Sequence, residues 1–473
     1  MKNPPVLVIQ MQRLGDLVLS FPLLGWLKMR YPDTPIWVVA EPVFFKGLMT
    51  LSPEVTYFPP EAAPALAKES YTAVINLSHR PEAAKLAGAA RTEELYGLYQ
   101  SNGATRIKGD WHLYRAGLTH NNRHNAFHWA DLNALDCIGT SMLQKTVWPP
   151  MRYASGSEGR IGLFLGASEQ DKHPDATFWA AFAEKLLAAG FKPVLLGGKA
   201  EMPLAARTAA ILKAPALNMA GRFSLPEFVE VLRSLRLLVT PDTGPMHVAA
   251  WTGTPTLNLS LGPVSAWETA PFPPGHFVLQ STLSCVGCWR CKHPRPYCHD
   301  QFSPARIASL VRMILSRTPA ALSTLHLPGQ RLLQSSRSTA GLFRLVPLDI
   351  SGKKLQPAYG RDFLRRFWQA YFFHTLADGK SESLHTAFSA LATAMPAIAE
   401  RLPAASLQLS RILSLGLRKG HHALGDSFWL QFPPFLRPLT GYLQQALSNE
   451  DYSRPAYAHA LKLVETLFAA LPR

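Results

Sequence analysis

The stretch "VTPDTGPMHVAA" (Val239–Ala250) decides the fold, because it places polar residues where a buried strand gives way to a helix. The largely apolar residues 235–239 and 256–259 on either side are typical of buried parallel strands. Gly244 allows a tight turn, and Pro245 suits the first position of a helix, where an N–H would be unpaired anyway. The segment therefore predicts a strand, a loop and a helix at the carboxyl edge of a parallel sheet.

Two interpretations of Asp242 and Thr243 are open at this point. Free backbone N–H groups at a helix start bind anions, and the ligands of open α/β sheets lie at this edge. Alternatively, the two side chains only cap the helix. Both interpretations predict the same local fold, so the choice between them depends on the rest of the chain.

The composition predicts a globular, cytoplasmic protein. The 473 residues suggest about three domains of ordinary size, or two larger ones with an appendage. Hydrophobic residues make up 47% of the chain, which is enough for sizeable cores. The first apolar stretch is too short for a signal sequence, and no run reaches the roughly 18 apolar residues of a membrane span.

The formal net charge of +16 indicates an anionic partner. No helix-turn-helix, zinc-finger helix or aromatic RNA-binding strand accompanies this charge, so no nucleic acid partner is expected. An anionic acceptor fits better, together with peripheral contact with the inner face of the inner membrane. A merely solvated basic surface is the alternative.

The order of elements predicts an α/β fold with two Rossmann-like domains facing a cleft. In residues 1–150 strands alternate with helices, beginning with the strand Val6–Met11. Residues 148–159, rich in Pro, Gly and Ser, are typical of a linker. Residues 151–330 repeat the alternation, so we expect a second parallel sheet there.

Residues 331–473 are expected to form an all-helical extension. Aromatic residues at helical spacing mark 361–376 as its first helix. Further helices are predicted over 385–402, 406–417 and 455–471, with a proline-broken connector over 428–438. The first helix is interpreted as a packing surface against the two domains, with an oligomer interface and a membrane-surface contact as alternatives.

Two loops of the second domain suggest a site for a nucleoside diphosphate. In "LGASEQDKHP" (165–174), Gly166 and Ser168 follow a strand and can approach a phosphate, while Lys172 supplies positive charge. In "LLGGKAE" (195–201), Glu201 follows a glycine pair and can accept hydrogen bonds from ribose hydroxyls. Parallel strands end at one sheet edge, so both loops are expected beside the helix start at Gly244.

Several familiar nucleotide and catalytic motifs are missing from the sequence. It contains no G-x-x-x-x-G-K-[ST] loop, no G-x-G-x-x-G after the first strand and no G-x-S-x-G elbow. No D-x-D pair is present to hold a metal-bound sugar nucleotide. We therefore expect protein groups, and not Mg²⁺, to neutralise the diphosphate.

Five stretches together resemble the bacterial heptosyltransferases of glycosyltransferase family 9. They lie in the family's order and spacing: residues 6–33, 165–174, 195–201, 218–228 and 240–263. The resemblance implies a GT-B fold and transfer of a sugar, typically heptose from ADP-heptose, with inversion at the anomeric carbon. Typical members act on the lipopolysaccharide inner core at the cytoplasmic face of the membrane. The chain departs from the family at His173, where an Arg-Trp pair is usual, and in its helical extension.

Matching positions carry the family's roles to this chain. Asp16 matches the general base, and Lys172 matches the lysine that steadies the diphosphate. The expected donor-binding set is Gly166, Ser168, Lys172, Glu201, Asp242, Thr243, Gly244 and His247. Considered by themselves, Asp16 could instead cap its helix and His247 could be an ordinary packed residue.

Four of the five cysteines fall within fourteen residues, "CVGCWRCKHPRPYC". Their spacing suits a tetrahedral structural site for zinc or iron. The alternative is a buried, reduced cluster without metal. The metal ligands would be Cys285, Cys288, Cys291 and Cys298.

Four hypotheses about function follow. The first is a heptosyltransferase acting on a glycolipid, and the second is the same chemistry on a protein acceptor, as in metal-containing oligomeric family members. The third is a GT-B-fold nucleotide-sugar epimerase, and the fourth is a non-catalytic nucleotide-binding scaffold. Asp16, Lys172 and Asp242 argue against the scaffold, and the match at "RLGD" argues against the epimerase.

Overall fold

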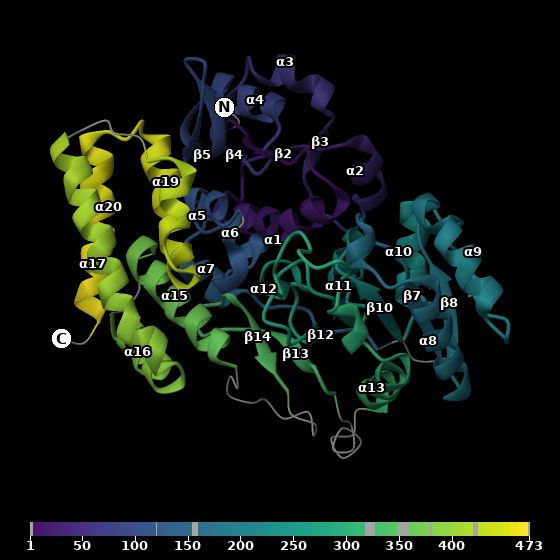
Figure 1. The fold of residues 1–473 in the computed structure, drawn as a ribbon. Helices are drawn as coiled ribbons and strands as arrows, with labels where there is room; N and C mark the ends of the chain where they lie inside the picture. The colour runs from purple at the N-terminus through teal and green to yellow at the C-terminus, as the bar shows by residue number, and fades with distance from the viewer. Residues whose placement is uncertain are drawn as a thin grey trace.

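The computed structural model describes residues 3–119, 121–153, 159–316, 327–348, 359–377, 381–419 and 424–471. Within these ranges the chain forms two α/β domains and a helical extension that lies beside both (Figure 1). The predicted GT-B-type architecture is therefore confirmed. Residues 154–158 of the predicted linker lie outside the described residues.

The first domain is built on a sheet with the strand order β3-β2-β1-β4-β5-β6. All neighbouring strands run parallel except β5 and β6, which form an antiparallel hairpin at the edge. The strands are β1 (Val6–Ile9), β2 (Ile36–Val39), β3 (Thr56–Phe58), β4 (Ser70–Asn76), β5 (Arg91–Ser101) and β6 (Ala104–Lys108).

Helices cover both faces of this sheet, because its central strands are apolar on both sides. Val6 and Val8 pack in the same core as the helix that follows β1, whereas Leu7 and Ile9 pack in a second core on the other face. The helices are α1 (Leu14–Arg30), α2 (Pro42–Leu48), α3 (Ala63–Leu66), α4 (Pro81–Ala89), α5 (Asp110–Gly117), α6 (Trp129–Leu132) and α7 (Thr140–Lys145).

The second domain has the strand order β14-β13-β12-β11-β10-β7-β8-β9. Its strands are β7 (Arg160–Phe164), β8 (Lys192–Leu196), β9 (Leu217–Asn218), β10 (Leu237–Pro241), β11 (Thr256–Ser260), β12 (Phe277–Ser281), β13 (Gln330–Arg337) and β14 (Phe343–Pro347). Its helices are α8 (Ala176–Ala188), α9 (Met202–Ile211), α10 (Leu225–Ser234), α11 (Gly244–Trp251), α12 (Ala266–Thr269) and α13 (Pro304–Ser316).

The strands β13 and β14 correct the prediction that residues 331–473 are all helical. They form an antiparallel hairpin that extends the second sheet beyond β12. The sequence of β13, "QRLLQSSR", hides the strand because buried polar side chains interrupt its apolar pattern: Arg331 bonds Gln280, and Ser335 bonds the carbonyl of Pro273. Such pairing exists only in the folded chain, so periodicity could not predict it.

The extension contains α15 (Gly360–Leu376), α16 (Ser381–Ala394), α17 (Pro396–Lys419), α18 (Asp426–Leu430), α19 (Arg437–Asn449) and α20 (Arg454–Ala470). The single helix predicted over 385–402 is wrong, since the chain breaks at Met395 and Pro396 starts a new helix. The connector predicted over 428–438 contains the first two residues of α19, Arg437 and Pro438, and the sequence pattern does not predict this helix. A proline in the first turn of a helix costs no hydrogen bond.

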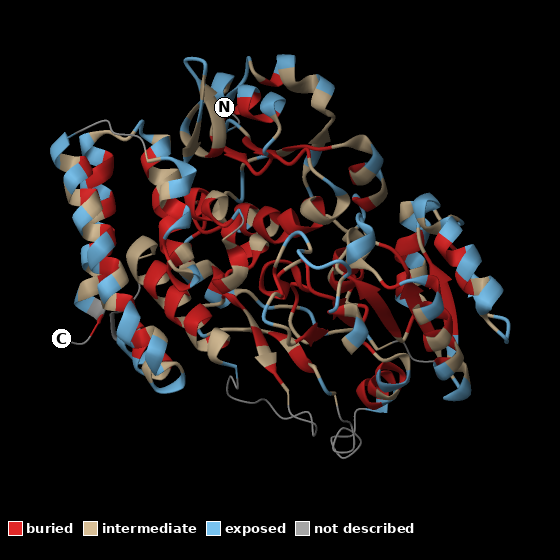
Figure 2. Ribbon diagram, in the orientation of Figure 1, coloured by how far each residue is buried: buried red, intermediate tan, exposed pale blue. Residues whose placement is uncertain are grey.

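The extension packs against both domains, as its first helix suggested. Phe367, Trp368 and Phe372 of α15 are buried in a core that is continuous with the first domain (Figure 2). On the α5 side, α19 approaches so closely that a β-carbon at Gly117 would lie 2.7 Å from the backbone of Gly441. None of the helices in the described part of the chain combines the length and apolar character needed to cross a bilayer.

Candidate active site

The loop before α1 and the start of α11 meet where the two domains face each other. A β-carbon at Gly15 would lie 3.3 Å from the α-carbon of Gly244 and 3.1 Å from Cδ2 of His247. Any larger residue at position 15 would press against His247 and the Gly244 backbone, so glycine suits this close approach of the two helix starts. The contact brings Asp16, from the first domain, beside the segment that begins at Asp242 in the second.

Asp242 and Thr243 do not cap α11. Thr243 occupies the N-cap position, but its side chain makes no capping hydrogen bond. The hydroxyl of Thr269 donates to the Asp242 carboxylate instead. Burial raises the pKa of Asp242 to about 6, although Thr269 and the positive charge of Lys172 act in the opposite direction. The helix start is thus left open at its amide end, which is the condition for binding an anion.

Lys172 and Asp242 lie within electrostatic reach of each other. Lys172 ends a short 3₁₀ helix, η3 (Gln170–Lys172), and its Nζ lies 2.7 Å from Oε1 of Glu169. Because the Glu169 side chain is 57% exposed, this ion pair is weak and can open to an incoming anion.

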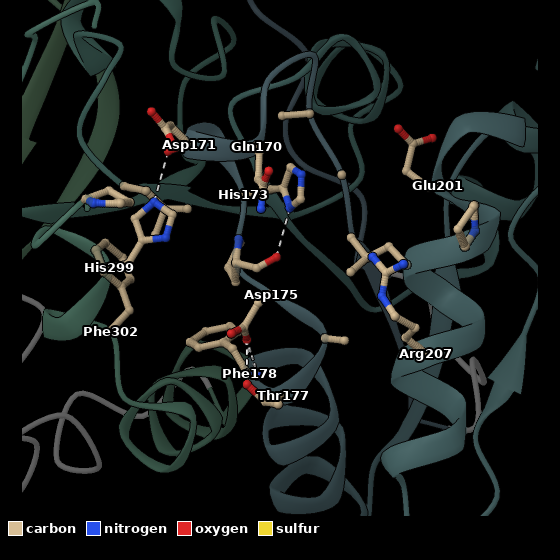
Figure 3. Close-up of a pocket in the computed structure, with 18 of the residues that line it drawn as sticks. Gln170, Asp171, His173, Asp175, Thr177, Phe178, Glu201, Arg207, His299 and Phe302 are labelled. Atoms are coloured by element: carbon tan, nitrogen blue, oxygen red, sulfur yellow. Dashed lines mark hydrogen bonds between the residues drawn. The ribbon is translucent and has the colours of Figure 1, made fainter. Parts of the chain in front are cut away.

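Gly166 and Glu201 lie together at a separate cavity of about 1070 Å³. A β-carbon at Gly166 would lie 2.8 Å from Oε1 of Glu201, so a larger residue there would displace the Glu201 side chain. Figure 3 shows Glu201 and Arg207 on one side of this large cavity and His299 on the other. Glu201 holds the backbone N–H of Gly198 with Oε2 at 2.7 Å.

The predicted donor residues are thus divided between two places. Gly166 and Glu201 line the large cavity, whereas the Asp242 segment lies at the contact between the domains. Ser168 is exposed in the loop between Gly166 and Lys172. The structure adds two wall residues that the sequence did not indicate, Phe178 and Arg207, because they come from helices without any motif.

Asp16 lines a cavity of about 560 Å³ in the first domain, the Asp16 cavity. One carboxylate oxygen accepts a hydrogen bond from the backbone N–H of Arg13 at 3.3 Å, so Asp16 does help to cap α1. Burial raises the pKa of Asp16, and the positive charge of Arg115 partly opposes the rise. Arg115 lies in the same cavity, with its guanidinium 5.3 Å from the Trp129 ring centre.

Glu268 is a second carboxylate in the Asp16 cavity that sequence reasoning missed. Its side chain is 1% exposed and accepts hydrogen bonds from Asn122 at 2.9 Å and from Asn125 at 3.1 Å. Burial raises the pKa of Glu268 to about 7. No local pattern marks it, because its partners lie more than one hundred residues away in the first domain.

His247 is buried on α11 against the Gly15 loop. Burial lowers its pKa to about 4, so the ring is neutral. Its Nδ1 atom has no hydrogen-bond partner among the described residues. A donor contact through His247 stays a prediction.

The four clustered cysteines line one cavity of about 570 Å³. Thiols are ligands that zinc and iron accept. However, no three His, Cys, Asp or Glu side chains in the described ranges are arranged so that they could hold one metal ion. As placed, the thiols do not form a metal centre, and the predicted metal stays untested.

Comparison with known proteins relates this geometry to one family. Residues 62–295 match the model of glycosyltransferase family 9 (heptosyltransferase). Lipopolysaccharide heptosyltransferase 1 of Pseudomonas aeruginosa is 29% identical over 171 residues, which cover 32% of this chain and 47% of that protein. The chain thus spans about half the length of this curated relative.

Two solved structures share the fold. The family 9 glycosyltransferase of Veillonella parvula superposes with a TM-score of 0.52 and 17% identity, covering 67% of this chain and 99% of that one. The ADP-heptose lipopolysaccharide heptosyltransferase II of E. coli gives a TM-score of 0.52 and 20% identity, covering 66% and 99%. Each of these two structures shares the fold over about two thirds of this chain. By this match, residues 62–295 of the chain carry a glycosyltransferase family 9 domain.

Proposed function

We propose that the protein is an inverting heptosyltransferase that transfers heptose from ADP-heptose to a hydroxyl of the lipopolysaccharide inner core. The observation that carries the proposal is the position of Asp16. A half-buried carboxylate in a cavity of the first domain lies directly beside the open start of α11 in the second. A base and an anion site are thus adjacent across the domain boundary.

The donor is proposed to bind on the second domain. The ribose would contact Glu201 in the large cavity. The diphosphate would contact Lys172 and the backbone N–H groups at the start of α11. As the glycosidic bond breaks, negative charge grows on the diphosphate. Preorganised backbone N–H groups and one lysine stabilise that charge without a divalent cation.

The acceptor is proposed to bind in the Asp16 cavity. Asp16 would take the proton from the attacking hydroxyl, and its raised pKa makes it a stronger base than an ordinary aspartate. Its second oxygen keeps the bond to the backbone of Arg13, which fixes the orientation of the carboxylate. The attack comes from the face opposite the diphosphate, which inverts the anomeric carbon.

The substitution Asp16→Asn tests the base. Asparagine can still accept the hydrogen bond from Arg13, so folding and ADP binding should persist. Transfer should fall about 10²-fold or more, because one proton acceptor is lost. Activity is measured as transfer of heptose from ADP-heptose to purified inner-core acceptor. Calorimetry measures the binding of ADP to the same variant.

Glu227→Gln is the matched control. Glu227 also holds a backbone N–H at a helix start, at 2.7 Å from Ser224, but it lines neither the large cavity nor the Asp16 cavity. If Asp16 acts only as a helix cap, the two variants should retain similar activity. Near-native turnover in Asp16→Asn would contradict the proposed role.

A further inference from the structure

A basic cavity lies beside the cysteine loop (residues 285–298). The loop 121–124 of the first domain and the start of α19 form its other walls, and its volume is about 570 Å³. Five basic side chains line it: Arg123, His124, Lys292, His293 and Arg437. No Asp or Glu is among its lining residues.

The positive charge in the basic cavity is not neutralised from within. The Nε atom of Arg437 and the Nδ1 atom of His124 are buried and have no hydrogen-bond partner in the described ranges. The pKa of His124 lies well below its ordinary value, because the ring is buried and because Arg365, Arg361 and Arg123 repel a proton. A buried polar group without a partner is costly, so these groups favour an anionic ligand.

The acids around this region are engaged with other partners. Asp362 bonds Arg331 and Arg365, Asp300 lies 2.5 Å from Arg295, and Glu268 accepts hydrogen bonds from Asn122 and Asn125. None of them forms an ion pair with Arg123, Lys292 or Arg437 in the part of the chain that the structure describes.

Trp289 joins this cavity to the proposed active site. It lines both the basic cavity and the Asp16 cavity. Its backbone has φ of +60°, a conformation that a bulky residue rarely adopts, and its N–H donates to the carbonyl of Pro263 at 2.8 Å. The loop thus holds the indole as a shared wall between the two cavities.

We propose that the basic cavity is an anion subsite, which holds a phosphate or carboxylate group of the acceptor while the reacting hydroxyl lies at Asp16. The inference rests on the proposed function. It goes further because Arg437, a residue of the helical extension, would take part in binding the acceptor. A guanidinium offers paired donors that match phosphate and carboxylate oxygens.

Inorganic phosphate is the probe. Calorimetry is carried out on protein saturated with ADP, so that the proposed diphosphate site is already filled. Phosphate should bind the ADP-saturated wild type, and Arg437→Gln should weaken the affinity by about 10-fold. Arg411→Gln, which removes the same charge from an exposed position on α17, should leave the affinity unchanged.

The rate at which the four thiols are alkylated tests whether phosphate binds in the basic cavity. Phosphate should slow their alkylation by iodoacetamide if it occupies the cavity that they line. In kinetic assays phosphate should compete with the acceptor, and Arg437→Gln should raise the acceptor KM with little change in kcat. If phosphate binds without competing with the acceptor, the cavity holds a free anion and not a group of the acceptor. That result would overturn the proposed subsite.

Two other results would also overturn the inference. One is equal phosphate affinity in Arg437→Gln, Arg411→Gln and the wild type. The other is a zinc or iron ion held by the cysteines of the purified protein together with no phosphate binding, since a metal bound to four thiolates is itself an anion. Phosphate binding is measured without turnover, so the two proposals can fail separately. The phosphate test can fail while Asp16→Asn still loses activity, and phosphate can bind as expected while Asp16→Asn keeps its activity.

Discussion

Replacing Asp362 by alanine should loosen the helical extension from the second domain. The Asp362 side chain is buried on α15 and accepts hydrogen bonds from Arg331 at 2.5 and 3.1 Å and from Arg365 at 3.1 Å. These arginines are 8% and 2% exposed. The substitution leaves two guanidinium groups buried without their carboxylate, and such a loss costs about 3–5 kcal/mol.

The free energy of unfolding of Asp362→Ala is measured by urea titration, with limited proteolysis to show whether the extension detaches first. Glu54→Ala is the matched control, because Glu54 also pairs with a basic side chain, Lys28, at 2.9 Å, but its side chain is 94% exposed. The control should lose far less stability. Equal losses in the two variants would refute the argument that burial makes the Asp362 contacts strong.

Saturating ADP should raise the melting temperature, and Asp242→Ala should abolish the shift; an equal shift in the variant would remove Asp242 from the donor site. EDTA should leave transfer unchanged, since Lys172 and the start of α11 are proposed to neutralise the diphosphate, and loss of activity restored by added Mg²⁺ would contradict this. Glu268 should contribute a fall in the free energy of unfolding as pH rises from about 5 to 8, against the rise that buried neutral histidines such as His247 contribute up to about pH 6.5. Folded Glu268, whose pKa is about 7, keeps a proton that the unfolded chain loses near pH 4.5. In urea titrations at both pH values, Glu268→Gln should remove up to about 3 kcal/mol of that fall, and an unchanged pH dependence would exclude Glu268 as the titrating group.

The sequence predicted best where local chemistry alone decides the structure. The run before Asp242 is apolar enough to be a buried strand in any context, and Gly244 with Pro245 specifies the turn and helix start. The same is true of the first strand and the loop that carries Asp16. These segments form the centre of each domain, and their placement could be derived without tertiary information.

The missed features depend on contacts between distant segments. Glu268 gains its buried environment from Asn122 and Asn125, and Arg115 enters the Asp16 cavity only after α5 has packed. The strand β13 is polar in sequence and becomes a strand because β12 supplies its hydrogen bonds. Residue patterns within one segment carry no information about such partners.

The glycine contact between α5 and α19 has a consequence for biosynthesis. Gly117 belongs to the first domain, yet the helix that covers it emerges only when Gly441 has been made. At about 5–20 residues per second the delay is roughly 15–65 s. During that time the face of α5 around Tyr114, which is 1% exposed in the finished protein, has no cover from the extension. The nascent first domain therefore exposes this face of α5 to solvent until the last helices leave the ribosome.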